Sequence, residues 1–258
     1  MAKTDVFITY IACMGVLIRD DEKSILIDAI ITPGIRPYPS ITKEVLVNMI
    51  KKAPPFNKID YILITHEHEE HFNPDFVCQV LSACPEARLI APKTVIARIR
   101  GSRYFKKRFI MQMIGLDIAP NKMVDFTLGK FQMFFIHLPH EADMHDIQNI
   151  AFLIQLGHYR LLFTGDSATN IEVFQQAGLT QKSIDCIIAP FTFVITESGV
   201  HTMDILQPRY LIAIHFPLPQ YDVNKRYQNA LDIINNPLSP LPRNTFLLTE
   251  SMKTVIIR

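Results

Sequence analysis

Cysteine is scarce in this sequence, and its few cysteines are not spaced as metal ligands are. The 258 residues include four cysteines, at positions Cys13, Cys78, Cys84 and Cys186. Cysteine-based zinc sites use closely spaced pairs of thiols, so we do not expect a cysteine-ligated metal here. Buried thiols in a reducing compartment are the simpler interpretation.

Net charge and long apolar runs are lacking too. The formal net charge is +1, so no global charge draws the chain to nucleic acid or to an anionic membrane. No uninterrupted apolar run approaches the length of a membrane span, and the first residues, Met1–Val6, lack the apolar core of a signal peptide. We therefore expect a cytoplasmic protein with no membrane association. Hydrophobic residues make up 48% of the chain, which is enough for a sizeable core.

The most informative stretch follows an apolar, β-branched run at Tyr61–Ile64 that is typical of a buried strand. The character changes at Thr65, and three histidines and three glutamates follow in positions 66–71. Asn73 and Pro74 then suit the N-cap and first turn of a helix. Neutral imidazoles and carboxylates are ligands that divalent first-row metals prefer. A charged surface loop is the alternative, but strand, polar cluster and capped helix together favour a metal site.

This stretch resembles the motif of the metallo-β-lactamase-fold hydrolases. Their pattern is Thr-His-x-His-x-Asp-His at the end of a strand, and Thr65, His66, His68 and His71 match it. Glu70 stands where the family has aspartate. The resemblance extends along nearly the whole chain because further motifs recur in order.

The resemblance implies an α+β fold, a four-layer αββα sandwich of two mixed β-sheets flanked by helices. Layered packing of this kind brings strand-end loops to one edge. The sequence itself shows only that strand-like and helix-like segments alternate, without repeats, low-complexity tracts or a linker. We accordingly expect one metallo-β-lactamase-like domain over residues 1–258.

Two aspartates sit at strand ends. Asp28 follows the apolar triplet Ile25–Ile27, where an aspartate is commonly a turn cap; the family instead has an aspartate here that supports the metal loop. Asp166 follows the strand Tyr159–Phe163 and precedes the helical stretch Asn170–Ala177. A Gly-Asp pair alone is a weak signal, but its place in the chain matches the motif in which the aspartate lies between two metals.

Two histidine positions complete the resemblance. His215 ends the apolar strand Tyr210–Ile214, as the last motif requires. Three histidines compete for the remaining motif, namely His137, His140 and His145. The family places this ligand just past a strand end, often after proline, so the Leu-Pro-His context favours His140.

The implied centre holds two divalent metal ions. One ion takes His66, His68 and His140; the other takes Glu70, His71 and His215, with Asp166 bridging. Zinc is favoured, although manganese and iron accept the same ligands. We expect a metal-activated hydroxide to attack an ester, lactone, amide or phosphoester bond of a small anionic substrate, with Asp166 and Glu70 as catalytic carboxylates.

Other interpretations remain open. A nuclease of the superfamily is disfavoured because the net charge is small and the stretch between Asp166 and His215 is too short for an added domain; a flavodoxin-like domain has no room either. The basic segment Arg98–Arg108 fits a solvated face, a cradle for an anionic substrate or a contact in a homo-oligomer. Glu70 favours a third alternative, a metal-binding protein that has lost catalysis.

Overall fold

The chain folds into two mixed β-sheets flanked by helices, which confirms the predicted α+β class. The computed structural model describes residues 5–128, 131–141 and 146–258. Contacts divide it into two compact units. The single domain spanning 1–258 stays a prediction.

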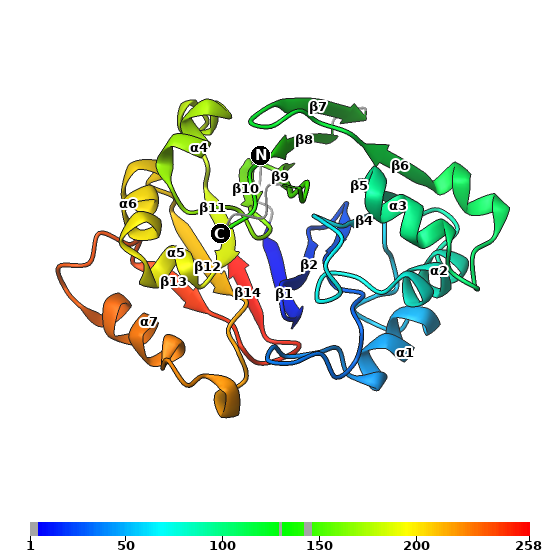
Figure 1. Cartoon of the computed structure of the whole chain (residues 1–258), viewed down its shortest axis with the longest axis horizontal. Helices are drawn as coiled ribbons and strands as arrows, with labels where there is room; N and C mark the ends of the chain where they lie inside the picture. Colours follow the sequence, from blue (N-terminus) through cyan, green and yellow to red (C-terminus); the bar gives the residue numbers. More distant parts are fainter. Residues whose placement is uncertain (1–4, 129–130, 142–145) are drawn as a thin grey trace. The chain divides into compact units, whose positions relative to one another are not determined.

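The first unit, Asp5–Asp117 with Glu250–Arg258, contains a seven-stranded sheet (Figure 1). In sheet order its strands are β14 (Thr254–Ile257), β1 (Val6–Ala12), β2 (Gly15–Arg19), β3 (Ser24–Ile27), β4 (Tyr61–Leu63), β5 (Arg88–Pro92) and β6 (Met113–Leu116). Pairing is antiparallel from β14 to β3 and parallel from β3 to β6. Short turns join β1, β2 and β3, whereas each parallel pair needs a crossover that contains a helix.

Three α-helices form these crossovers. They are α1 (Lys43–Lys51), α2 (Pro74–Ala83) and α3 (Lys93–Arg100), the last followed by the 3-10 helix η1 (Lys107–Gln112). Asn73 caps α2 as predicted, its side chain accepting a hydrogen bond from the Phe76 amide at 3.0 Å, and Pro74 occupies the first turn. The cap fixes where the polar stretch ends and the helix begins.

One face of this sheet forms a core with the helices. Leu26, Ile62 and Leu89 lie side by side on β3, β4 and β5, and all three are buried in one cluster with Val77 of α2 and Val95 of α3. Burying each such side chain stabilises the fold by about 1.5–3 kcal/mol. The packing holds the carboxyl ends of β3 and β4 next to each other.

The second unit, Ile118–Thr249, contains the other seven-stranded sheet. In sheet order its strands are β13 (Asn244–Leu247), β12 (Tyr210–Ile214), β11 (Cys186–Pro190), β10 (Tyr159–Phe163), β9 (Ile150–Leu156), β8 (Phe131–His137) and β7 (Met123–Leu128). Pairing is antiparallel from β7 to β10 and parallel from β10 to β13. Consequently β8, β10 and β12 run in the same direction, and the loops that follow them leave from the same edge of the sheet.

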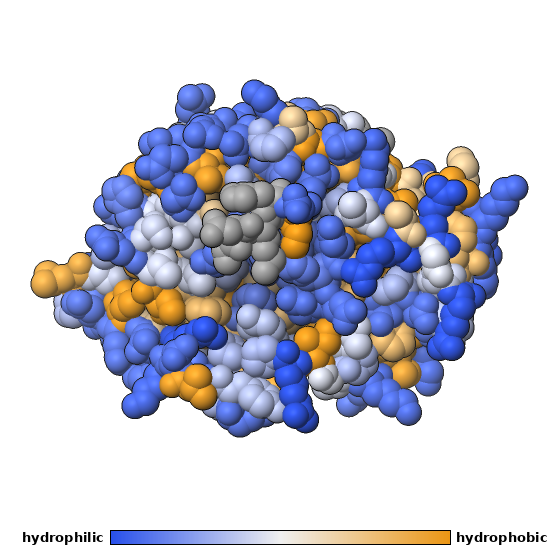
Figure 2. All heavy atoms as spheres, viewed as in Figure 1, coloured by the Kyte–Doolittle hydropathy of each residue, from blue (hydrophilic) through white to orange (hydrophobic). Residues whose placement is uncertain are grey.

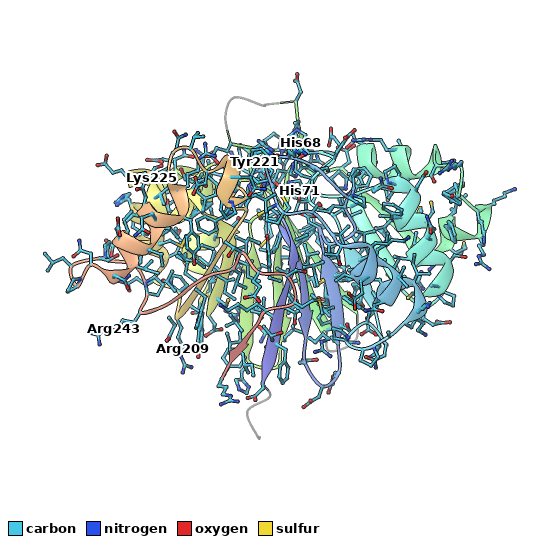
Figure 3. The ribbon with its side chains drawn as sticks, turned by 90° about the horizontal axis from the view of Figure 1, so that it is seen from below. His68, His71, Arg209, Tyr221, Lys225 and Arg243 are labelled. Carbon is cyan, nitrogen blue, oxygen red and sulfur yellow. The ribbon has the colours of Figure 1, made fainter. Side chains whose placement is uncertain are left out.

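The helices of the second unit lie between its strands along the chain. They are α4 (Ile171–Gln176), α5 (Thr192–Ile195), α6 (Glu197–Leu206) and α7 (Arg226–Asn235), with 3-10 turns η2 (Leu179–Gln181) and η3 (Pro219–Tyr221). In Figure 3, Arg209 and Arg243 mark the amino ends of β12 and β13, and Tyr221 and Lys225 lie at the opposite edge. Of the helices in the described ranges, none is long and apolar enough to span a bilayer.

Candidate metal centre

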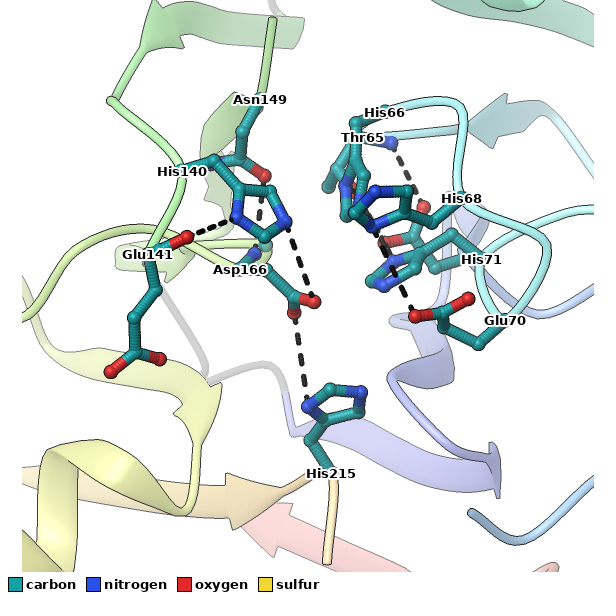
Figure 4. A network of polar contacts seen from close by, with 12 residues as sticks. Thr65, His66, His68, Glu70, His71, His140, Glu141, Asn149, Asp166 and His215 are labelled. Carbon is teal, nitrogen blue, oxygen red and sulfur yellow. Dashed lines mark hydrogen bonds and ion pairs between the residues drawn. The ribbon is translucent and has the colours of Figure 1, made fainter. Parts of the chain in front are cut away.

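In the first unit, the loop Thr65–His71 follows β4 and carries the predicted metal ligands, so we call it the ligand loop. His66 and His71 are fully buried, and the His68 side chain is 26% exposed. Asn73 connects the end of the loop to the rest of the unit, because its backbone amide donates to the Ile30 carbonyl at 2.7 Å. Three histidines are thus held within six positions of one short loop, as the sequence motif predicted (Figure 4).

Asp28 holds this loop from inside the unit. It follows β3, and its buried carboxylate accepts hydrogen bonds from the Thr65 amide at 2.9 Å and from the Thr65 hydroxyl at 2.7 Å. His71 Nδ1 lies 2.8 Å from the same carboxylate. A carboxylate oxygen only accepts, so we assign the His71 proton to Nδ1 and the lone pair to Nε2. The supporting role expected for Asp28 therefore has a geometric basis.

Thr65 fixes the tautomer of His66 in a similar way. Its hydroxyl has one proton, which goes to Asp28, so it accepts from His66 Nδ1 at 2.9 Å. We therefore assign the lone pair of His66 to Nε2. His68 Nδ1 lies 2.9 Å from that atom, within hydrogen-bond distance, so these two ring nitrogens are neighbours.

Glu70 lies beside His68. Its carboxylate is 3.9 Å from His68 Nδ1, and both side chains are 26% exposed. The longer side chain in the position of the family aspartate thus brings its oxygens to the outer, more solvated part of the loop. Charge there is screened by water more strongly than at a fully buried ligand.

The second unit brings three predicted ligands to one edge of its sheet. His140 follows β8, Asp166 follows β10 and His215 follows β12. One Asp166 oxygen is 3.9 Å from His140 Nε2, and the other is 4.0 Å from His215 Nδ1 (Figure 4). These separations exceed hydrogen-bond distance. Each oxygen of the carboxylate therefore faces a different histidine.

The three candidate histidines of the remaining motif differ in their surroundings. His140 Nδ1 donates to the Glu141 carbonyl at 2.6 Å, which leaves the lone pair on the nitrogen that faces Asp166. His137 is the last residue of β8, and its Nδ1 donates to the Ile118 carbonyl at 2.7 Å. His145 lies outside the described residues. Of the two described histidines, His140 is thus the one that lies beside the Asp166 carboxylate.

Asn149 is a functional candidate that the sequence analysis missed. It is fully buried just before β9, and its side-chain amide donates to the carbonyls of Leu138 and Thr164, at 3.3 and 3.0 Å. Its oxygen accepts from the Asp166 amide at 3.1 Å. Asn149 therefore ties the loop that carries His140 to the loop that carries Asp166. A polar residue directly before an apolar strand was the available signal, and it is a common one.

The acidic group next to His140 is perturbed. Glu141 is partly buried, which raises the pKa of its carboxyl group, and the negative charge of Asp166 raises it further. The nearby Thr192 hydroxyl acts on this pKa in the opposite direction. Burial and the charge of Asp166 thus disfavour a second negative charge at this edge of the sheet.

The basic segment contacts polar side chains of its own unit. Arg103 pairs with Asp75 at 3.2 Å, and Lys106 and Arg108 each donate to Ser82 at 3.1 Å. Figure 2 shows hydrophilic side chains interleaved with apolar ones on this part of the surface. These contacts agree with a largely solvated face.

The donor set of each unit fits divalent metal ions. Zinc, manganese and iron bind imidazole nitrogens and carboxylate oxygens. The first unit offers the Nε2 lone pairs of His66 and His71, and the second unit offers His140 Nε2 and the Asp166 carboxylate. Hydrogen bonds behind the rings, donated by the imidazoles to Asp28, Thr65 and the Glu141 carbonyl, provide the outer support that histidine ligands require.

Comparison with known proteins gives the family. A family model described as "Beta-lactamase superfamily domain" matches residues 7–215, and the chain belongs to this family. It is a member of a superfamily of metal-dependent hydrolases. Among curated proteins, it is similar to a UPF0173 protein of Pyrococcus abyssi, with 26% identity over 203 residues and 78% of each chain covered.

Solved structures share the fold. Igni18, a metallo hydrolase from Ignicoccus hospitalis, matches with a TM-score of 0.64 and 16% identity over 98% of this chain and 99% of its own. An isothiocyanate hydrolase from Delia radicum gut bacteria gives 0.62 and 12% over 96% and 98%. CmlA, a diiron β-hydroxylase from Streptomyces venezuelae, gives 0.63 and 14% over all of this chain and 55% of CmlA. Identities this low establish the fold alone.

Proposed function

We propose that this chain is a dinuclear metal-dependent hydrolase acting on an ester, lactone, amide or phosphoester bond of a small anionic molecule. The observation that carries the proposal is the Thr65–His71 loop, in which hydrogen bonds to Asp28 and Thr65 orient buried histidines for metal binding. Membership of the family supports hydrolysis as the reaction class.

The proposed ligands are those that the family resemblance implies. One ion is assigned to His66, His68 and His140, and the other to Glu70, His71 and His215, with Asp166 shared. Asp166 suits the shared position because each of its oxygens faces a different histidine, at 3.9 and 4.0 Å. Zinc is the metal we favour, since the ligands proposed here are mostly imidazoles with few carboxylates.

Bound divalent ions would supply Lewis-acid chemistry and lower the pKa of coordinated water to about 7. The protein's part is to orient the donors. Asp28 keeps the proton of His71 on Nδ1, and Asn149 holds the Asp166 backbone in place. Both contacts exist before substrate arrives, so the site needs little reorganisation during the reaction.

The substrate and compartment belong to the same proposal. The anionic character of the substrate rests on the sequence alone, which gathers Arg and Lys residues over Arg98–Arg108. The four cysteines are buried and free of disulfides, which supports a reducing, cytoplasmic location.

Metal analysis followed by a hydrolase substrate panel tests the proposal. The wild-type protein should contain zinc or another divalent metal and cleave at least one member of the panel. The His66→Ala variant should contain less metal and show no hydrolysis. His158→Ala is the matched control, because His158 is exposed in the turn between β9 and β10. Full metal content in His66→Ala would refute the ligand assignment; bound metal without hydrolysis of any substrate class would favour the catalytically impaired alternative.

A further inference from the structure

The ligand loop is held from a second side by helix α3. Arg98 Nη1 donates to the backbone carbonyl of Glu67, the residue between His66 and His68. Thr94, one turn earlier on the helix, donates its hydroxyl to the Glu67 carboxylate at 3.0 Å. Residues four apart share a helix face, so one face of α3 grips both the backbone and the side chain of Glu67.

Arg98 also reaches the remainder of the loop. Its Nη2 lies 3.9 Å from the Glu69 carboxylate, and its guanidinium carbon lies 5.0 Å from the centre of the Phe72 ring. Phe72 is buried and forms a β-bridge with Ile30, so the ring is a fixed platform. A planar guanidinium is suited to stacking and hydrogen bonding at once, which an ammonium group is not.

These contacts alternate with the ligands along the chain. Glu67, Glu69 and Phe72 touch α3, whereas the proposed metal ligands of the loop are His66, His68, Glu70 and His71. Before the bridge at Phe72, the loop has a turn in which the His71 amide donates to the His68 carbonyl at 3.1 Å, and it has no helix or strand. Side-chain contacts therefore contribute to its backbone path. Asp28 fixes its two ends at Thr65 and His71, and α3 fixes the part between them.

A simpler role for Arg98 is stabilisation of the helix dipole, since it lies in the last turn of α3. Arg100 lies in the same turn and can have the same effect. However, two residues along a helix correspond to about 200° of rotation, so Arg100 faces away from the loop. The dipole role therefore does not distinguish the two arginines, whereas the loop contacts do.

We infer that the Thr94–Arg98 face of α3 is a clamp that sets the separation of His66 and His68 and thereby the affinity of the metal site. The inference rests on the proposed function, because it assigns a task to residues that support the proposed ligands. Arg98 is a positioning residue in this scheme. Metal sites tolerate ligand displacements of only about 0.2 Å, so a loop released at Glu67 should bind metal more weakly.

The test is cobalt(II) binding to metal-free protein, measured by competition with a chromogenic chelator. Arg98→Met removes the donors and the charge but keeps an unbranched side chain, and Arg100→Met is the matched control in the same turn. We expect about 10-fold weaker binding for Arg98→Met and unchanged binding for Arg100→Met. Arg98→Lys should restore part of the affinity, because the ammonium can donate to the Glu67 carbonyl but cannot stack as a planar group.

Two further measurements separate positioning from general stability. The visible spectrum of bound cobalt(II) should change in Arg98→Met, because it reports ligand geometry, while the melting temperatures of the two metal-free methionine variants should agree closely. Equal affinity losses in Arg98→Met and Arg100→Met, or no loss in either, would overturn the clamp. Failure of the wild-type protein to bind cobalt(II) would instead overturn the proposed function.

Discussion

Replacing Asp28 by asparagine should separate folding from metal binding. The substitution preserves shape and one oxygen, so the bond from the Thr65 amide can persist. In the wild-type protein the other oxygen accepts from the Thr65 hydroxyl at 2.7 Å and from His71 Nδ1 at 2.8 Å. In the variant an amide group that donates takes its place. His71 can satisfy that new donor only by moving its proton to Nε2.

The two consequences differ in size. Each lost charge-assisted hydrogen bond is worth about 1.5–3 kcal/mol, but the altered tautomer of His71 recovers part of this, so we expect a loss of about 1–3 kcal/mol in unfolding free energy. Metal binding suffers more, because a proton on Nε2 blocks the proposed ligand atom. Outer-shell substitutions of this kind typically lower metal affinity 10–100-fold, and we expect the upper part of that range.

The assay compares urea unfolding of metal-free protein with metal affinity from chelator competition. Asp60→Asn is the control, because the Asp60 carboxylate accepts from the Ser24 amide at 2.8 Å at the other end of β3. It should lose some stability and keep wild-type affinity. Nitrogen chemical shifts of the imidazoles should show the tautomer change in Asp28→Asn alone. Wild-type affinity in Asp28→Asn would refute the assigned role of Asp28.

Three other predictions follow from the geometry. His140→Ala should lose metal while His137→Ala retains it, by elemental analysis; the reverse result would mean that His137 is the ligand. Metal titration should show two steps with the weaker one absent in Glu70→Ala, and a single step unaffected by that change would exclude Glu70 as a ligand. Gly15→Ala should lower the melting temperature by several degrees, because a Cβ there would lie 2.8 Å from three backbone atoms, whereas Gly101→Ala, with a nearest neighbour at 3.4 Å, should have little effect.

Strand ends were the part of the site that the sequence could predict. Apolar runs that stop at Asp28, Thr65 and His215 are visible as abrupt changes of residue type, and the structure ends β3, β4 and β12 at or just before them. A strand that stops in a polar residue leaves that side chain in a loop, where it need not pack in a core. Periodicity thus located the candidates, and the family motif selected among them.

Contacts distant in sequence were beyond that reasoning. Asn149 joins two loops through hydrogen bonds to Leu138, Thr164 and Asp166, and nothing in its immediate sequence announces those partners. Arg98 appeared only as one member of a basic segment, because the Glu67 carbonyl it contacts lies 31 positions earlier. Tautomers are equally hidden, since they depend on which neighbour of a ring nitrogen has a proton to give.

Backbone conformation adds a reason to regard Asp28 and His215 as functional residues. Asp28 has φ of 47° and His215 has φ of 66°, in the left-handed region that glycine occupies easily and other residues at a cost of about 1–3 kcal/mol. Each follows a buried strand, at a point where the chain must turn sharply. Glycine would make that turn without strain, but it would supply neither the carboxylate that holds Thr65 and His71 nor the imidazole that faces Asp166. The packed strands therefore sustain a strained conformation, and the side chains held there account for it.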